Sequence, residues 1–310
     1  MQCFKMSKEK KWKTSEFKGV IQENEQIFLI LSSDEMRHYQ TCFNWPLRTV
    51  DTCLSNKLMP QVEIHEAFDF GILQRLKLNA DQYTTQFFSF YISPHYLVLV
   101  FYKRDEWIQK FCHSLITDEQ EICDISHLFF HLLDVVIEPD AHYLDAISEE
   151  IEGLEERIFN EDISKFSKEI MAIRKKLSLF KKHYEPLVDI IEDFVGNEST
   201  ICSSQSIRYF KILKSRINRL RAEVDHLGEY ATHVREAYDA QVDIKQNRIM
   251  KYFTLIASVF LPLTLIVGWY GMNFTTMPEL DWKYGYIYVM VLSVVSSLLC
   301  LYCFKKKRWM

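Results

Sequence analysis

Two long uncharged stretches dominate the C-terminal end of the chain. Residues 252–278 carry no charged side chain, and a second uncharged run, 284–304, follows a short acidic loop. A helix needs about 20 predominantly apolar residues to cross a bilayer. The pattern therefore predicts two membrane-spanning helices, at 252–272 and 284–304, joined by an external loop at 273–283.

A long helical pattern precedes the first span. Apolar or small residues recur there at alternating steps of three and four, and no proline occurs from residue 201 until Pro262. We expect one continuous helix, with a stalk at 205–251 that runs on into the span and a total length on the order of 100 Å. Such a helix needs partners along its apolar stripe, which favours a symmetric oligomer. The stripe consists of Leu213, Ile217, Leu220, Val224, Leu227, Ala231, Val234 and Tyr238.

Residues 124–204 form a segment with the period of amphipathic helices. One helix follows Pro139, with Asp140 as its predicted N-cap. A second helix, 163–195, is basic in its middle, is expected to pair with the first, and ends at a glycine. The first helix has an acidic face, which is typical of a solvated surface; a cation-sensing surface is the alternative. Its acids are Glu149, Glu150, Glu152, Glu155, Glu156, Glu161 and Asp162.

Short runs rich in aromatic and branched residues mark the N-terminal part. They lie at 26–31, 85–92 and 95–102, and the turn signal Ser93-Pro94 predicts that the last two form a hairpin. We interpret residues 1–123 as a small α/β domain. The expected fold class is thus an α/β cytoplasmic domain, a long α-helical stalk and two C-terminal transmembrane helices.

Composition and charge place this fold in a membrane. The 310 residues have a formal net charge of -5 and 25% charged residues, which excludes both a disordered acidic chain and a uniformly apolar bundle. The N-terminus is polar and basic and does not resemble a secretory leader. Positive residues flank the cytoplasmic side of the predicted spans, in 245–251 and in the basic tail 305–310. The positive-inside rule then predicts that both termini face the cytoplasm, with a multi-pass location in the cell membrane and lipid as a partner.

Several classes of function find no support in the sequence. The chain has only eight glycines and no phosphate-binding loop, and its ten histidines form no constellation with a nucleophile. We therefore expect no catalytic residue, no enzyme activity, no cofactor and no nucleic-acid partner. Eight cysteines are scattered without a pairing pattern and are typical of small core residues in a reducing compartment.

The loop between the spans carries the most specific motif. The string YGMNFTTMPELDWKYGY covers residues 270–286, and the chain ends in KKKRWM. This region, about the last sixty residues, resembles the C-terminal membrane module of the CorA family of divalent-cation transporters; upstream only the organisation is similar. The resemblance implies a homopentameric funnel that admits Mg²⁺, with Co²⁺ and Ni²⁺ as further ions.

The resemblance also implies a selectivity filter at the outer mouth. Its residues are Gly271, Met272 and Asn273, and the acidic loop residues Glu279 and Asp281 would attract cations to the entrance. Mg²⁺ gives up its water reluctantly, so a ring of Asn273 carbonyls would bind the ion in the outer sphere, through its hydration water. Carboxylates near the mouth would concentrate cations by their local potential.

By the same resemblance, one face of the first span lines the pore. The pore-lining residues are Asn247, Met250, Phe253, Ala257, Leu261, Thr264 and Gly268. Met250, Phe253 and Leu261 would form an inner constriction that gates by excluding water, with Phe253 where an aliphatic residue is expected. The alternative for the polar positions is ordinary helix packing, in which serine and threonine bond back to their own helix.

The mechanism expected from these features is passive. Neither span holds an acidic or basic residue that could relay protons, and the membrane potential alone contributes about 4.6 kcal/mol per 100 mV for a divalent ion. Mg²⁺ is then both the transported ion and the expected regulatory ion, although the sequence does not place the regulatory site. Two alternatives stay open: a zinc-transporting member of the same family, and a two-span sensor or anchor with a coiled stalk.

Overall fold

The structure, a computed structural model, divides into two compact units, Met1–Val234 and Arg235–Met310, and each is considered by itself. It describes the following residues: 1–7, 11–17, 19–21, 25–55, 58–79, 82–102, 105–117, 122, 124–159, 165–196, 204–272, 277 and 282–306.

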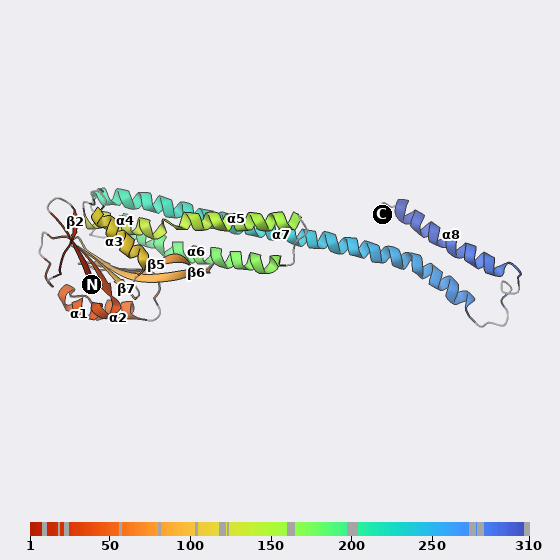
Figure 1. Ribbon diagram of the computed structural model, residues 1–310, viewed down its shortest axis with the longest axis horizontal. Helices are drawn as coiled ribbons and strands as arrows, with labels where there is room; N and C mark the ends of the chain where they lie inside the picture. Colours follow the sequence, from red (N-terminus) through yellow and green to blue (C-terminus); the bar gives the residue numbers. More distant parts are fainter. Residues whose placement is uncertain are drawn as a thin grey trace. The chain divides into compact units, whose positions relative to one another are not determined.

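The first unit is built on a mixed sheet (Figure 1). Strands β3 and β7 pair in parallel, and the other neighbours pair antiparallel in the order β2-β1-β3-β7-β6-β5-β4. The predicted hairpin of β6 and β7 is confirmed, with Ser93 Oγ accepting a hydrogen bond from Tyr96 N (3.1 Å) in the turn. The described strands are β1 (Gln2–Met6), β2 (Trp12–Thr14), β3 (Ile27–Ser32), β4 (Gln61–Ile64), β5 (Asp69–Asn79), β6 (Gln82–Ile92) and β7 (Tyr96–Phe101).

Helices cover both faces of the sheet, which explains why its central strands are apolar throughout. On one face, β3 packs with α1 (Ser33–Phe43) and α2 (Leu47–Leu54) in a core that includes Leu29 and Tyr91. On the other face, α3 (Glu106–Thr117) and α4 (Ile125–Ile137) are in contact with aromatic residues of the strands (Figure 1). The ring pairs there are Phe28 with Phe111, Phe88 with Trp107, and Phe90 with Phe129.

Two long helices, α5 (Asp140–Phe159) and α6 (Phe166–Val195), pack against each other beyond α4. The predicted pairing of basic α6 side chains with the acidic face of α5 is confirmed, because Lys176 Nζ lies 2.5 Å from Glu150 Oε1. Arg157 of α5 and Glu169 of α6 form a further pair of the opposite sense. The amide of Gln74 donates to the Lys182 carbonyl (3.0 Å), which ties β5 to α6. The apolar stripe of α5 is buried, at Leu144, Ile147, Ile151, Leu154 and Ile158.

The capping prediction for α5 is wrong. Asp140 is the first helical residue, and the Tyr143 amide donates to the Pro139 carbonyl (3.2 Å). The Asp140 carboxylate is fully buried and accepts a hydrogen bond from the Tyr184 hydroxyl (2.9 Å). The side chain therefore joins α5 to α6, because it is used for tertiary contact instead of the backbone donors of its own first turn.

Helix α7 runs without interruption from Ser204 to Tyr270 and confirms the predicted continuous helix. Its apolar stripe from Leu213 to Val234 is buried inside the same chain, except for Leu220, which is half-buried. Side-chain contacts reach the stalk from three helices: Arg216 pairs with Asp134 of α4, Lys214 with Glu192 of α6, and Tyr230 donates to Glu155 of α5. The interpretation of this part of the stripe as an intermolecular contact is therefore wrong, since neighbouring helices of one chain produce the same heptad spacing.

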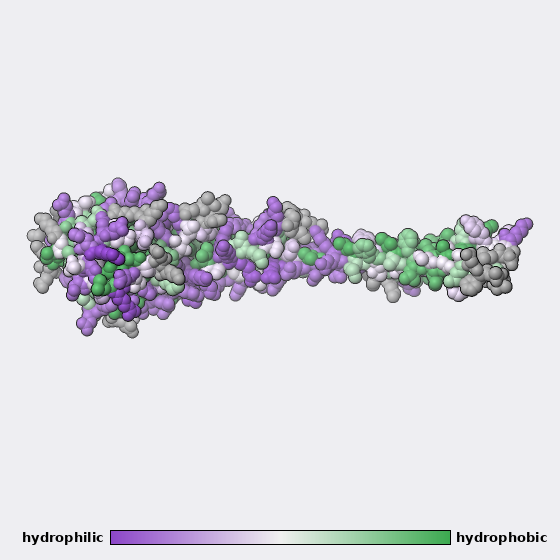
Figure 2. Space-filling view, turned by 90° about the horizontal axis from the view of Figure 1, so that it is seen from below, coloured by the Kyte–Doolittle hydropathy of each residue, from purple (hydrophilic) through white to green (hydrophobic). Residues whose placement is uncertain are grey.

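The second unit holds the end of α7 and helix α8 (Gly285–Lys306). Both helices are long and apolar enough to cross a membrane, and none of their apolar windows is buried within the chain. Hydrophobic side chains gather over this unit, whereas hydrophilic ones dominate the first (Figure 2). Unlike the stalk stripe, this apolar surface is not covered by other parts of the described chain.

Candidate functional site

The seven residues expected to line a pore lie on one face of α7. They follow one another at steps of three or four residues, and at about 100° per residue they all fall within an arc of about 120°. All seven side-chain positions are exposed in the single chain. They are Asn247, Met250, Phe253, Ala257, Leu261, Thr264 and Gly268. The helix thus presents one continuous stripe that alternates polar, small and bulky apolar positions.

Two threonines, Thr264 in this stripe and Thr254 next to it in sequence, bond to their own helix. Thr264 Oγ1 donates to the Phe260 carbonyl (2.8 Å), and Thr254 Oγ1 donates to the Met250 carbonyl (2.8 Å). This is the geometry of the packing alternative. A hydroxyl that donates in this way keeps lone pairs that can accept from water, so the same geometry also suits a wet pore wall.

The bulky positions of the stripe are widely exposed. Met250 is 64% exposed, Phe253 67% and Leu261 70%. Three large apolar side chains open to the surroundings are costly in water. They are suited to a bilayer or to contact with copies of the same helix.

The helix ends where the predicted filter begins. The Gly271 amide donates to the Val267 carbonyl (2.8 Å), and Met272 N donates to the Trp269 carbonyl (3.4 Å). A Cβ atom on Gly271 would lie 2.8 Å from the Val267 carbonyl oxygen, closer than a side chain tolerates. The backbone at this turn therefore requires glycine. The other predicted site residues of this loop, Asn273, Glu279 and Asp281, lie outside the described residues.

The acidic face of α5 is partly used in structural contacts. Glu150 pairs with Lys176, and Glu155 Oε2 accepts a hydrogen bond from the Tyr230 hydroxyl (2.5 Å). Within the part of the chain that the structure describes, no three histidine, cysteine, aspartate or glutamate side chains come together as a metal-binding group. These contacts favour the solvated, ion-paired interpretation of the face over a metal site contained in one chain.

Sequence reasoning missed a buried polar cluster between α5 and α6. Asp140, His183 and Tyr184 are each fully buried, and His183 Nε2 lies 3.3 Å from Asp140 Oδ2. Burial and the neighbouring Asp140 charge raise the pKa of Tyr184. A histidine within a helical pattern carries no sign of such a partner in the sequence. The cluster lies in the soluble unit and links the helices that support the stalk.

Comparison with known proteins agrees with this architecture. The family model described as "CorA-like Mg2+ transporter protein" matches residues 27–306. The cobalt/magnesium transport protein CorA of Thermotoga maritima is 28% identical over 184 residues, which cover 59% of this chain and 52% of that protein. The alignment thus spans about half of that relative. The magnesium transport protein CorA of Helicobacter pylori is 24% identical over 238 residues, 74% of this chain and 73% of the relative.

Solved structures share the fold, one over the whole chain and another over 78% of it. The complete CorA magnesium transporter of Methanocaldococcus jannaschii superposes with a TM-score of 0.84 at 22% identity and covers 100% of this chain and 98% of that one. The ZntB cytoplasmic domain of Vibrio parahaemolyticus gives a TM-score of 0.64 at 14% identity over 78% of this chain and 98% of that one. Because these sequence identities are low, the two structures establish only that the fold is shared. The family match extends through the soluble unit and both apolar helices, and the chain belongs to the CorA-like Mg²⁺ transporter family.

Proposed function

We propose that this chain forms a homopentameric channel for Mg²⁺ influx. The observation that carries the proposal is the exposed stripe of α7, which leads to Gly271-Met272-Asn273 in a member of this family. A single stripe of small, polar and apolar positions cannot enclose a path by itself. Several copies arranged around an axis would enclose it, with each copy contributing the same stripe.

Ion recognition would take place at the outer mouth. Mg²⁺ prefers octahedral oxygen coordination and loses its water slowly, so a filter that stripped the ion would conduct poorly. A ring of Asn273 side chains offers carbonyl oxygens that accept hydrogen bonds from the hydrated ion. Close contact between Gly271 and the Val267 carbonyl would fix the turn that aims this ring.

Negative charge at the outer mouth would concentrate cations there, and the membrane potential would drive them through the pore. Glu279 and Asp281 in the outer loop would raise the local concentration of cations, an effect that weakens with ionic strength. The first span has no charged residue between 252 and 270 that would oppose a cation or carry a proton. The membrane potential then suffices as the driving force, and the protein needs no catalytic step and no cofactor.

Gating would act at the inner constriction. Rings of Met250, Phe253 and Leu261 would exclude water when they approach each other and conduct when they separate. The basic residues at 245–251 and in the tail support the proposal, by the positive-inside rule, that both termini would face the cytoplasm with the protein in the cell membrane. Intracellular Mg²⁺ is the proposed regulator, acting through the soluble unit.

The ion and the driving force are tested together in liposomes. Purified protein is reconstituted, a negative internal potential is imposed, and uptake of Mg²⁺ and Zn²⁺ is measured with and without a proton gradient. We expect Mg²⁺ uptake that follows the potential and does not need the proton gradient. Zinc uptake that requires the gradient would identify the zinc-transporting alternative, and absence of any flux would support the sensor or anchor.

The assembly is tested separately. Native mass spectrometry of the purified protein in detergent is expected to give the mass of five chains, each of 37.0 kDa. A stable monomer or dimer would contradict the proposed pore, because too few stripes would surround the axis.

A further inference from the structure

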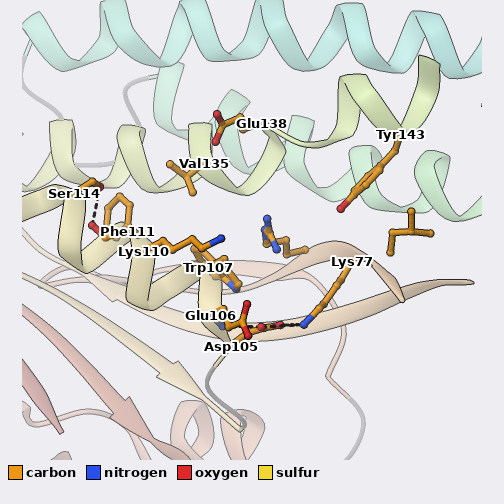
Figure 3. Close-up of a pocket in the computed structure, with 12 residues that line it drawn as sticks. Lys77, Asp105, Glu106, Trp107, Lys110, Phe111, Ser114, Val135, Glu138 and Tyr143 are labelled. Atoms are coloured by element: carbon orange, nitrogen blue, oxygen red, sulfur yellow. Dashed lines mark hydrogen bonds and ion pairs between the residues drawn. The ribbon is translucent and has the colours of Figure 1, made fainter. Parts of the chain in front are cut away.

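A pocket of about 420 Å³ opens in the soluble unit between strand β5, helix α3 and the junction of α4 with α5 (Figure 3). Its volume lies in the range of about 300–1,000 Å³ that is usual for small-molecule sites. It is distant in sequence from the stripe of α7 and plays no part in the proposed transport path. The pocket therefore calls for a separate explanation.

The central feature of the pocket is the guanidinium of Arg75. It lies over the Trp107 ring, 5.2 Å from the ring centroid, which holds it in place. Its Nε atom is buried and has no hydrogen-bond partner. Among the described residues, no carboxylate forms an ion pair with it within 4.0 Å. Arg75 is thus a positioned cation whose Nε donor has no partner and whose guanidinium forms no ion pair with any residue that the structure describes.

The electrostatic surroundings agree with this geometry. Burial lowers the pKa of Arg75, even though the more distant groups of Tyr143, Asp140, Asp105 and Glu138 act in the opposite direction. The surroundings therefore stabilise the cation less well than water does. A bound anion would supply the missing stabilisation.

A second cation of the pocket has its own partner. Lys77 Nζ lies 2.8 and 3.0 Å from the two carboxylate oxygens of Asp105, and Asp105 Oδ1 also accepts from the Glu106 amide (2.7 Å). The carboxylate of Asp105 is therefore occupied by Lys77 and by the start of α3. The Asp105 carboxylate is thus paired with Lys77 and not with the guanidinium of Arg75.

Two further donors converge on the pocket. Lys110 extends from α3 into the space, and Tyr143 directs its hydroxyl into it from α5 (Figure 3). Lys110 is exposed and pairs with no carboxylate among the residues that the structure describes. Phe111 and Val135 add an apolar wall. The acids Glu106 and Glu138 also line the pocket, so placed donors and not a large positive field would determine what binds.

We propose that this pocket binds a small phosphate-bearing molecule, with its phosphate held by Arg75 and Lys110 and by the Tyr143 hydroxyl. The planar donors of a guanidinium match two oxygens of a phosphate at once, and a lysine adds a mobile point charge. The pocket has room beyond a phosphate group, and Phe111 and Val135 lie where an organic part of the ligand would rest. Free phosphate, a nucleotide or an inositol phosphate headgroup all share this chemistry.

Calorimetric titration of the full-length protein in detergent tests the proposal. A chelator removes divalent cations, so that a metal cannot bridge phosphate to the acidic side chains. The probes are inorganic phosphate, adenosine monophosphate and a soluble inositol phosphate, with citrate as a non-phosphate anion. We expect saturable binding of at least one phosphate probe and weaker binding of citrate, and the tightest probe identifies the source of the phosphate.

Variants locate the binding. Lys110→Ala and Arg75→Met should each lower the affinity for the phosphate probe by about tenfold or more, as expected for the loss of charge-assisted hydrogen bonds. Lys175→Ala, which removes an exposed lysine of α6, is the matched control and should leave the affinity unchanged. Because Lys110 is exposed, its variant stays informative even if Arg75→Met fails to fold. Absence of binding, equal affinity for citrate, or affinity unchanged in Lys110→Ala would overturn the proposal.

Discussion

The Tyr184 hydroxyl donates a 2.9 Å hydrogen bond to Asp140 Oδ2, and both side chains are completely buried. This bond joins the first residue of α5 to the middle of α6. His183 lies beside it, with Nε2 3.3 Å from the same carboxylate oxygen. A buried carboxylate needs such partners, because an isolated one would be strongly destabilising. The contact is therefore a main point of attachment between the helices that support the stalk.

Tyr184→Phe should lower the stability of the soluble unit. The variant keeps the ring but removes a hydrogen bond to a buried carboxylate, which costs about 1.5–3 kcal/mol. Thermal unfolding in detergent at pH 8 measures the effect. Tyr39→Phe is the matched control, since Tyr39 packs through its ring and its hydroxyl makes no hydrogen bond among the described residues. A variant as stable as the control would contradict the structural role of the bond.

The same tyrosine predicts a loss of stability at alkaline pH. Burial, followed by the Asp140 charge, raises the pKa of Tyr184 above that of an unfolded tyrosine, which is about 10. Below that pH both states are protonated and the contribution is fully present. Above it the unfolded state ionises first, so the contribution is lost as the pH rises. Tyr184→Phe lacks this loss, and its stability deficit against the native protein should shrink above pH 10. A constant deficit would contradict the assignment.

Gly268 of α7 and Gly271, in the turn after this helix, provide a matched pair. A Cβ atom on Gly271 would lie 2.8 Å from the Val267 carbonyl oxygen, whereas a Cβ on Gly268 meets nothing within 4 Å in the single chain. Gly271→Ala should therefore displace the turn before Asn273 and strongly reduce Mg²⁺ flux. Gly268→Ala should fold and assemble normally.

Flux assays in liposomes, with the oligomer checked by native mass spectrometry, separate the two glycine variants. Because the Gly268 position has free space in the single chain, a loss of flux in Gly268→Ala would show that this residue lines the pore or packs against another copy. Full flux in Gly271→Ala would show that the close contact with Val267 does not position the filter.

Phe253→Ala should increase the leak of the closed state. Phe253 is 67% exposed on the pore stripe, and a smaller side chain would widen and wet the proposed constriction. Mg²⁺ uptake measured at high internal Mg²⁺, where the gate should be closed, is expected to rise severalfold. Tyr252→Ala is the control, because Tyr252 is a similarly exposed aromatic residue (64%) that lies about 100° around the helix from Phe253, outside the pore stripe. An equal rise in Mg²⁺ uptake in both variants would show that Phe253 is not part of the gate.

The sequence predicts those parts of the fold that depend on local periodicity. The hairpin of β6 and β7, the continuous helix α7 and the charge pairing of α5 with α6 follow from spacing and turn residues. Strand β5 is not predictable as a separate element, because its residues mix polar and apolar types. The parallel pairing of β3 with β7 is not predictable from either strand alone, because it depends on chain crossovers.

The remaining differences arise from tertiary contacts. The heptad spacing of the stalk has the same form for contacts within one chain and between chains, and the structure buries most of the stripe from Leu213 to Val234 within one chain. Asp140 has the ordinary signature of an N-cap, yet Tyr184 and His183 approach it from a helix more than forty positions away. Arg75 lies in a strand without any motif, and only the fold places Trp107, Lys110 and Tyr143 around it.

Asn273→Ala tests the central claim most directly. Mg²⁺ uptake into liposomes under a negative internal potential is measured for the native protein and the variant, with native mass spectrometry as the check on assembly. The account predicts that the variant assembles as the native protein does but loses selective Mg²⁺ uptake. A variant that assembles and takes up Mg²⁺ at the native rate, with the native preference over other cations, would contradict it.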